Sequence, residues 1–296
     1  MMFYRKTLGD KVFDAVVYTL VILVMIVTLY PLIYVFSMSI SDPIAAARGD
    51  VWLLPVGFDL TAIKKVLSDN QVLTYYGNTI WYTVVGTVCG VITTALCAYP
   101  LSRKEFIHRN LIMKIVMITM FFNGGIIPTF IVVSRFLHLY NSRWAIVVCS
   151  LTTAWYVTIA RSFFESLPDE IIESARLDGA SEYRIFGQLV LPLSKPILAV
   201  LTLYMAVGHW NAYFNSMLYI SDKTKQPLSL YIRSVIIQNS LSGLVNNTEA
   251  LTAGEILAAL QLKYAVIIVS VLPMLLIYPF ISKNLEKGLM IDAVKG

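Results

Sequence analysis

Charged side chains are scarce in this sequence. Asp, Glu, Lys and Arg make up 14% of the 296 residues, whereas hydrophobic residues make up 57%. A soluble domain has about 25% charged residues, so this composition excludes an ordinary soluble protein and predicts several membrane-spanning helices. The net charge of +5 requires no nucleic-acid partner, because cytoplasmic loops of membrane proteins collect Lys and Arg.

Several kinds of chemical site are also missing. No Gly-Lys pair occurs, which excludes a Walker A loop for ATP. Cys89, Cys97 and Cys149 lie inside apolar runs, where thiols are usually small core residues, so neither a disulfide nor a metal site is predicted. The apolar runs hold no acid pair, metal-ligand cluster or Ser/His/Asp set, so we expect no catalytic residue and no cofactor in this chain.

Six stretches of the chain carry no Asp, Glu, Lys or Arg. They lie between Asp14 and Asp42, Asp69 and Arg103, Lys114 and Arg135, Arg143 and Arg161, Lys195 and Asp222, and Lys263 and Lys283. Each is close to or above the ~20 residues that a helix needs to cross a bilayer, and the first is too long for a signal-peptide core. We therefore predict an all-α integral membrane protein with six transmembrane helices. Since ion-coupled carriers usually hold ionisable residues at membrane depth, the charge-free spans disfavour a self-powered carrier.

The distribution of Lys and Arg predicts the orientation. If the N-terminus is inside, 14 of these residues lie on the inner side and 9 on the outer side. This bias favours both termini in the cytoplasm. It also places two longer segments outside, at residues 41–74 and 221–262, and a polar segment, Glu173–Pro192, inside.

The polar segment reads as two short helices joined at Asp178-Gly179. Pro168 suits a first helical turn, and Gly179 can adopt the left-handed conformation that ends a helix. Ser181 can cap a second helix, which we expect to stop before Pro192. Apolar residues recur at helical spacing in both helices: Ile171, Ile172 and Ala175, then Ile185, Phe186 and Leu189. A surface helix–turn–helix and an amphipathic linker between spans both fit this pattern.

Three of the predicted spans contain unusual residues. Gly86 and Gly90 form a small-xxx-small pattern that lets helices approach closely. Asn123-Gly124-Gly125 with Pro128 interrupts the third span, which is tolerated where the backbone lines a cavity or packs on protein. The fifth span carries amides, aromatic rings and His209 near its outer end. We expect a substrate path there, and packing or an interfacial aromatic belt is the alternative. The candidate path residues are Asn123, Trp210, Asn211, Tyr213 and Asn215.

The polar segment resembles a family motif. Permease subunits of ABC importers carry Glu-Ala-Ala-x-x-x-Gly, nine residues, then Ile-x-Leu-Pro. Here Glu173-Ser174-Ala175, Gly179 and Leu189–Pro192 stand at the same spacing, with Ser174 and Leu189 as departures. The run Ala175–Ser181 is similar to the carbohydrate-importer branch. So are Phe121–Pro128, Val207–Phe214 and the tail Gly288–Gly296, where Asp292 replaces an expected Gly.

The resemblance implies a type I ABC importer permease fold. It implies an N-terminal part at residues 1–73, a transmembrane core at 74–283 with a coupling helix at about 168–192, and a cytoplasmic tail at 284–296. The residues that would contact an ATPase are Glu173, Ser174, Ala175, Asp178, Gly179 and Ala180, with Met290, Asp292 and Lys295 in the tail.

The resemblance also implies the partners. They are a homologous second permease, two ATPase subunits that would bind ATP and Mg, and an extracytoplasmic solute-binding protein. We therefore expect a permease for a carbohydrate, most simply an oligosaccharide, in a bacterial cytoplasmic membrane. An ion-coupled secondary carrier and a non-transporting membrane scaffold are the rival hypotheses.

Overall fold

A computed structural model of the chain describes residues 7–122, 124–242 and 261–276. The regular structure in these ranges is helical, apart from one isolated β-bridge between Ser41 and Phe58. This confirms the predicted helical class. The chain divides into two compact units, residues 1–69 with 234–271 and residues 70–233 with 272–296, and each is described by itself.

The first unit is dominated by a long apolar helix, α1 (Leu8–Ser39). It begins with a capping box in which Thr7 and Asp10 exchange hydrogen bonds, and side-chain burial is confined to its end, at Ser37–Ser39. An apolar helix without a buried face suits a lipid environment.

Two short helices follow α1 in the same unit. Asp42 caps α2 (Pro43–Arg48), which ends at Gly49 in the left-handed conformation, and α3 (Thr61–Ser68) comes next. A helix at Gln261–Leu276 begins in this unit, where the Gln261 amide donates to the Ser41 carbonyl at 2.6 Å.

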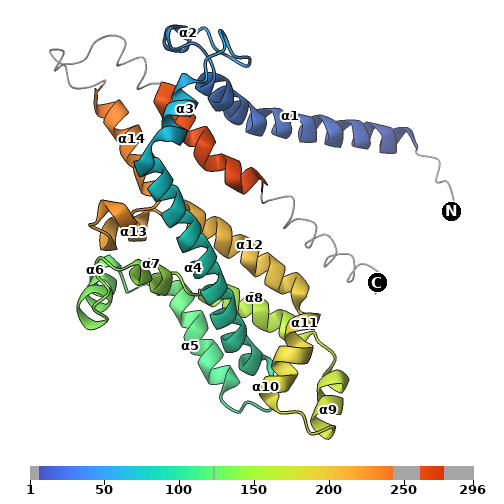
Figure 1. The fold of residues 1–296 in the computed structure, drawn as a ribbon. Helices are drawn as coiled ribbons and strands as arrows, with labels where there is room; N and C mark the ends of the chain where they lie inside the picture. Colours follow the sequence, from blue (N-terminus) through green and yellow to red (C-terminus); the bar gives the residue numbers. More distant parts are fainter. Residues whose placement is uncertain (1–6, 123, 243–260, 277–296) are drawn as a thin grey trace. The chain divides into compact units, whose positions relative to one another are not determined.

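The second unit is built around α4 (Asn70–Ser102), which packs against α8 and α12 (Figure 1). The elements that follow α4 in this unit are α5 (Arg109–Phe121), α6 (Ile126–Ile131), the π-helix η1 (Val132–Phe136), α7 (Arg143–Cys149), α8 (Ala154–Glu165), α9 (Asp169–Leu177), α10 (Glu182–Ile185), the π-helix η2 (Phe186–Val190), α11 (Leu191–Leu193), α12 (Lys195–Asn211), α13 (Phe214–Tyr219) and the 3₁₀ turn η3 (Lys223–Lys225). The first six residues of α14 (Leu228–Ser242) also belong to it.

Gly86 and Gly90 allow α4 to approach its neighbours closely. A Cβ atom on Gly86 would stand 2.6 Å from the His209 ring of α12, and one on Gly90 would stand 2.7 Å from the Leu151 carbonyl. The predicted packing role of these glycines is thereby confirmed, and the buried His209 ring is part of the same packing.

Within the described ranges, two helices are long and apolar enough to cross a membrane, α1 and α4. The number rises to five if each of three bent helix pairs forms one span. The described part of the last charge-free run is the shorter apolar helix at Gln261–Leu276. Six spans therefore stay a prediction, as do the domain boundaries at 73 and 283.

Breaks in the predicted spans have local causes. The fourth span bends by 54° between α7 and α8, where Thr153 caps the new helix. The third is interrupted between α5 and α6, where Gly125 has a positive φ of 85°. The fifth is shorter than its apolar run, because α12 ends at Asn211 and the chain turns before α13.

Candidate functional site

The first half of the polar segment is the second part of α9. Pro168 precedes α9, and Asp169 and Glu170 occupy its first turn, where carboxylates favour the positive end of a helix. Gly179 has a φ of +77°, as the sequence predicts. Its amide donates to the Arg176 carbonyl, and the Ala180 amide donates to the Ala175 carbonyl, each at 3.0 Å. This pair of bonds is a Schellman motif, which ends α9 with its last carbonyls satisfied.

The second half of the polar segment is longer than predicted. Ser181 caps α10 as expected, accepting from the Arg184 amide at 3.4 Å. The prediction that the helix stops before Pro192 is wrong, since helical turns continue through η2 into α11 and end at Leu193. The π-helical turn shifts the hydrogen-bond pattern just before Pro192, and proline tolerates the first turn of the helix that follows.

One face of the polar segment is buried and the other is exposed. Ile172 and Ile185 belong to the core of the second unit, together with Phe164 and Leu201. On the outer face, Glu173, Ser174, Asp178 and Gly179 are exposed, whereas Ala175 and Ala180 are half-buried. Leu177 and Tyr183 are each 90% exposed, which is unusual for large apolar or aromatic side chains. Four of the predicted coupling residues therefore form an accessible ridge (Glu173, Ser174, Asp178 and Gly179), next to two exposed hydrophobic side chains, whereas Ala175 and Ala180 pack partly against the core.

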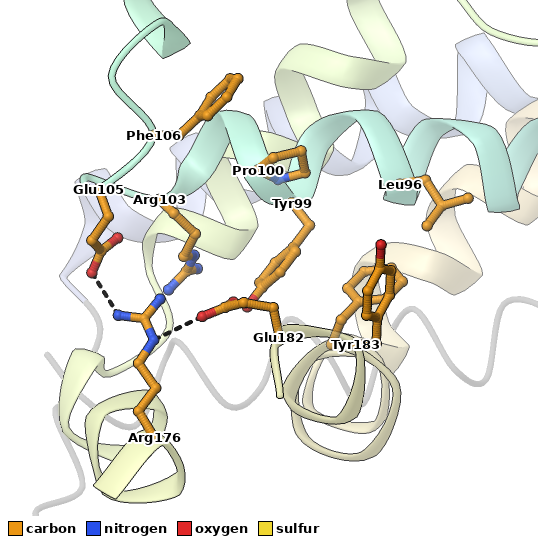
Figure 2. Close-up of a pocket in the computed structure, with 10 residues that line it drawn as sticks. Leu96, Tyr99, Pro100, Arg103, Glu105, Phe106, Arg176, Glu182 and Tyr183 are labelled. Atoms are coloured by element: carbon orange, nitrogen blue, oxygen red, sulfur yellow. Dashed lines mark hydrogen bonds and ion pairs between the residues drawn. The ribbon is translucent and has the colours of Figure 1, made fainter. Parts of the chain in front are cut away.

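Arg176 connects the two halves of the segment to the end of α4 (Figure 2). Its guanidinium donates to Glu105 at 2.7 Å and to Glu182 at 2.9 Å, and the Tyr99 hydroxyl of α4 donates to the other Glu182 oxygen at 2.9 Å. The hydrogen bond from Arg176 lowers the pKa of Glu105, and the bonds to both carboxylates raise the pKa of Arg176. Ionised partners are thus favoured on both sides of the bridge.

A second set of charges holds the start of α9. Lys104 pairs with Asp169 at 2.9 Å, which lowers the pKa of Asp169 and raises that of Lys104. The buried Arg103 side chain donates to the Phe164 carbonyl and, at 3.0 Å, to the Ser102 hydroxyl. Apart from the Arg176–Glu182 and Arg103–Ser102 bonds, the contacts in these two sets join α8, α9 or α10 to the last turn of α4 and the loop after it.

A cavity of about 470 Å³ lies beside the Arg176 bridge. Its lining combines the charged groups of the bridge with the apolar side chains of Leu96, Pro100, Phe106 and Phe186 (Figure 2). The cations and carboxylates around the cavity already pair with charged groups of the chain. The cavity therefore has no excess of positive or negative charge that would attract a ligand.

Four of the five predicted path residues lie around the break between α12 and α13. Trp210 is buried and packs edge-on against Tyr76, with 6.1 Å between ring centres. Asn211 is exposed and donates to the Val207 carbonyl at 3.0 Å, and Asn215 donates to the Ser150 hydroxyl at 3.3 Å. Tyr213 is 40% exposed. The structure thus brings Asn211, Tyr213 and Asn215 to one bend, while the Trp210 ring packs inside the chain.

The remaining predicted site residues are outside the described ranges. These are Asn123 and the tail residues Met290, Asp292 and Lys295. In the ranges that the structure describes, no three His, Cys, Asp or Glu side chains are close enough together to hold a metal ion.

A family model for the binding-protein-dependent transport system inner membrane component matches residues 1–291. The chain belongs to this family. It is therefore an ABC importer permease, a transport subunit that works with a separate ATPase and a solute-binding protein, and a membrane protein.

Among curated relatives of this permease, protein LplC of Bacillus subtilis (strain 168) is 37% identical over 270 residues, covering 91% of this chain and 90% of LplC. The polygalacturonan/rhamnogalacturonan transport system permease protein YtcP of the same organism is 33% identical, covering 97% of this chain and 99% of YtcP.

A solved relative shows the same fold. It belongs to a bacterial ABC transporter involved in the import of the acidic polysaccharide alginate. The two chains superpose with a TM-score of 0.84 and are 36% identical in sequence, and the match covers 96% of this chain and 99% of the solved chain. The permease therefore has the type I fold that its motif predicts.

Two features of this permease were not found from the sequence. Glu105 completes the Arg176 bridge from 71 residues away, and Arg233 lies over the Tyr213 ring with 5.0 Å between the guanidinium carbon and the ring centre. A sequence signal was present for Arg176, which stands inside the motif, but nothing in its spacing pointed to Glu105.

Proposed function

We propose that this permease carries a carbohydrate, most simply an oligosaccharide, across a bacterial cytoplasmic membrane after delivery by a solute-binding protein. The observation that carries the proposal is the ridge of the polar segment, where Glu173, Ser174, Asp178 and Gly179 are exposed at a bend that Gly179 makes with its positive φ. Family membership, the similarity to the polygalacturonan/rhamnogalacturonan permease YtcP and the similarity to the alginate importer support the substrate class.

The complex that we propose has two permeases, this chain and a homologous one, with two ATPase subunits that bind ATP and Mg. In this proposal six spans cross the membrane, both termini are cytoplasmic, and the ridge faces the ATPase. The 14-to-9 bias of Lys and Arg and the six charge-free runs support this topology.

In the same proposal, Glu173, Ser174, Ala175, Asp178, Gly179 and Ala180 contact the ATPase, and Met290, Asp292 and Lys295 reach it from the tail. Leu177 and Tyr183 add apolar area to the ridge, which suits an interface whose centre is desolvated. Closure of the ATPases on ATP would move α9–α11 as a body. The Arg176 bridge and the shared core would pass that movement to α4.

Substitutions at Gly179 test the docking proposal. Nothing in the described chain lies within 4 Å of a Cβ at this position, so the chain itself has room for a side chain. Gly179→Ala and Gly179→Trp incur the same left-handed backbone strain, about 1–2 kcal/mol, but only tryptophan adds bulk to the ridge. We expect Gly179→Trp to abolish ATPase co-purification and uptake, and Gly179→Ala to reduce them only modestly.

Gly49 supplies a matched control for this experiment. It also ends a helix with a positive φ, 80°, and has nothing within 4 Å of a Cβ, but it lies in the predicted outer segment. Gly49→Trp should leave ATPase co-purification intact. Normal uptake by Gly179→Trp would contradict docking, and uptake driven by an ion gradient without any ATPase would favour a secondary carrier. Co-purification of partners without solute flux would favour a scaffold.

A further inference from the structure

The start of α14 is fixed onto the break between α12 and α13. The Ser229 hydroxyl donates to the Ala212 carbonyl at 2.8 Å, at the residue where α12 has ended. Residues four apart share one face of a helix, so this bond also directs Arg233 toward the same break. The Arg233 guanidinium lies over the Tyr213 ring and contacts the Met217 sulfur.

Both groups that hold Arg233 are uncharged. In the described ranges, no carboxylate lies within ion-pair distance of it, whereas Arg103, Arg161 and Arg176 each have an acidic partner. An aromatic face attracts a guanidinium but occupies none of its N–H donors, and a thioether sulfur is a weak acceptor. The guanidinium is therefore held in place with most of its hydrogen-bonding capacity unused.

A planar guanidinium matches a carboxylate through two parallel hydrogen bonds. Tyr213, which holds Arg233, is partly exposed, and the predicted path residue Asn211 is exposed two residues earlier, at the end of α12. Amide groups suit the hydroxyls of a sugar, and an arginine beside them adds recognition of an acidic substituent.

We propose that Arg233, oriented by Tyr213, binds a carboxylate of the transported sugar and makes this permease select acidic oligosaccharides. The inference rests on the proposed function. It adds that the transported sugar is acidic, and it names the residue that binds the acidic group. Tyr213 acts as a positioning residue, because its ring fixes the guanidinium plane before the sugar arrives.

The test uses the full complex in proteoliposomes with its binding protein, and trigalacturonate as the probe. We expect Arg233→Gln to lower trigalacturonate uptake at least tenfold, which corresponds to about 1.4 kcal/mol, while stimulation of ATPase activity by the binding protein is retained. Arg233→Lys should recover only part of the uptake, because an ammonium group lacks the planar fork. Arg135→Gln is the control, since Arg135 is an exposed cation of η1 with no acidic partner in the described ranges, and it should leave uptake unchanged.

Two results would overturn the inference. One is unchanged trigalacturonate uptake in Arg233→Gln, and the other is an equal loss in Arg233→Gln and Arg135→Gln. Failure of the proposed function has a different signature, because the wild-type complex would then show neither uptake of any carbohydrate nor stimulation by a binding protein. A Tyr213→Leu variant gives an independent check, since it should weaken trigalacturonate uptake while leaving uptake of the neutral methyl ester less affected.

Discussion

Two bends in the second unit differ in how their charged side chains are held. At Gly179 the chain turns between α9 and α10, and the charges beside the turn are paired, with Arg176 bonded to Glu105 and Glu182. At Ala212 the chain turns between α12 and α13, and the cation beside that turn, Arg233, rests on an aromatic ring without an acid in the described ranges.

This difference separates a mechanical site from a binding site. At the first bend the charges are paired and the core is buried. A force on the outer ridge can therefore move the bend as a body without breaking its internal hydrogen bonds. The second bend has a guanidinium with no acidic partner in the described ranges and exposed side chains beside it, to which a ligand can bind. The three predictions that follow test the contrast, in order of decreasing expected effect.

The largest effect should come from the core beneath the first bend. The Ile185 side chain is fully buried, so Ile185→Ala should lower the free energy of unfolding by about 2–5 kcal/mol through lost burial and a cavity. At the second bend, Phe214 is 41% exposed, and Phe214→Ala should lower the free energy of unfolding by much less than Ile185→Ala does. Thermal unfolding of the purified complex in nanodiscs measures both. Equal shifts in the two variants would mean that the bends do not differ in rigidity.

Replacing Arg176 should have an intermediate effect. It should change the coupling of ATP hydrolysis to uptake more than the stability of the fold. Its side chain is 31% exposed and its partners more so, and exposed ion pairs stabilise a fold by only about 0.2–1 kcal/mol each. Arg176→Ala also leaves Glu105 and Glu182 without their shared cation and removes the link from the last turns of α9 to Glu105, so that only the start of α9 stays paired with the loop after α4, through Lys104 and Asp169. We expect uptake per ATP hydrolysed to fall about tenfold, equivalent to about 1.4 kcal/mol of lost coupling.

Arg184→Ala provides the matched control for Arg176. Arg184 lies on α10 of the same segment but bonds, through its side chain, to Gln188 within its own helical stretch, at 3.0 Å. Its removal should leave the ratio of uptake to hydrolysis near that of the wild type. If the ratio of uptake to hydrolysis falls equally in both variants, the Arg176 bridge does not transmit the movement of α9–α11 to α4.

Local signals made the first bend predictable. A left-handed residue needs glycine, and a helix cap needs a hydroxyl three residues before the amide that it accepts, so Gly179 and Ser181 could be assigned from the sequence alone. The continuation of the helix past Pro192 was missed because a π-helical turn has no comparable sequence signal.

Contacts between distant segments were not predictable in the same way. The Arg176 bridge joins residues 71 apart, and Ser229 anchors α14 to a carbonyl 17 residues earlier, so neither follows from helical spacing. Helices occur in the described part of each of the six apolar runs, as predicted, but the breaks inside the runs depend on single positions such as Gly125 and Thr153. Asn211, Tyr213 and Asn215 lie at one bend, but the Trp210 ring is buried, which its sequence position could not show, and a substrate path along these residues stays a prediction.

The smallest effect should be a pH dependence at the first bend. The bond from Arg176 holds the pKa of Glu105 below its ordinary value of 4.5. A carboxyl whose pKa is lower in the folded state stabilises the fold at neutral pH, and this contribution is lost as the pH falls below 4.5 and through the folded pKa. Glu105→Gln removes that term, so the melting temperature of the wild type should fall more steeply below this pH than that of the variant. Between pH 6 and pH 8 the difference between the two should stay constant. Because the Glu105 side chain is 61% exposed, the change should be small and should shrink further at high salt, and parallel melting curves at low salt would show that the bridge contributes nothing to the fold.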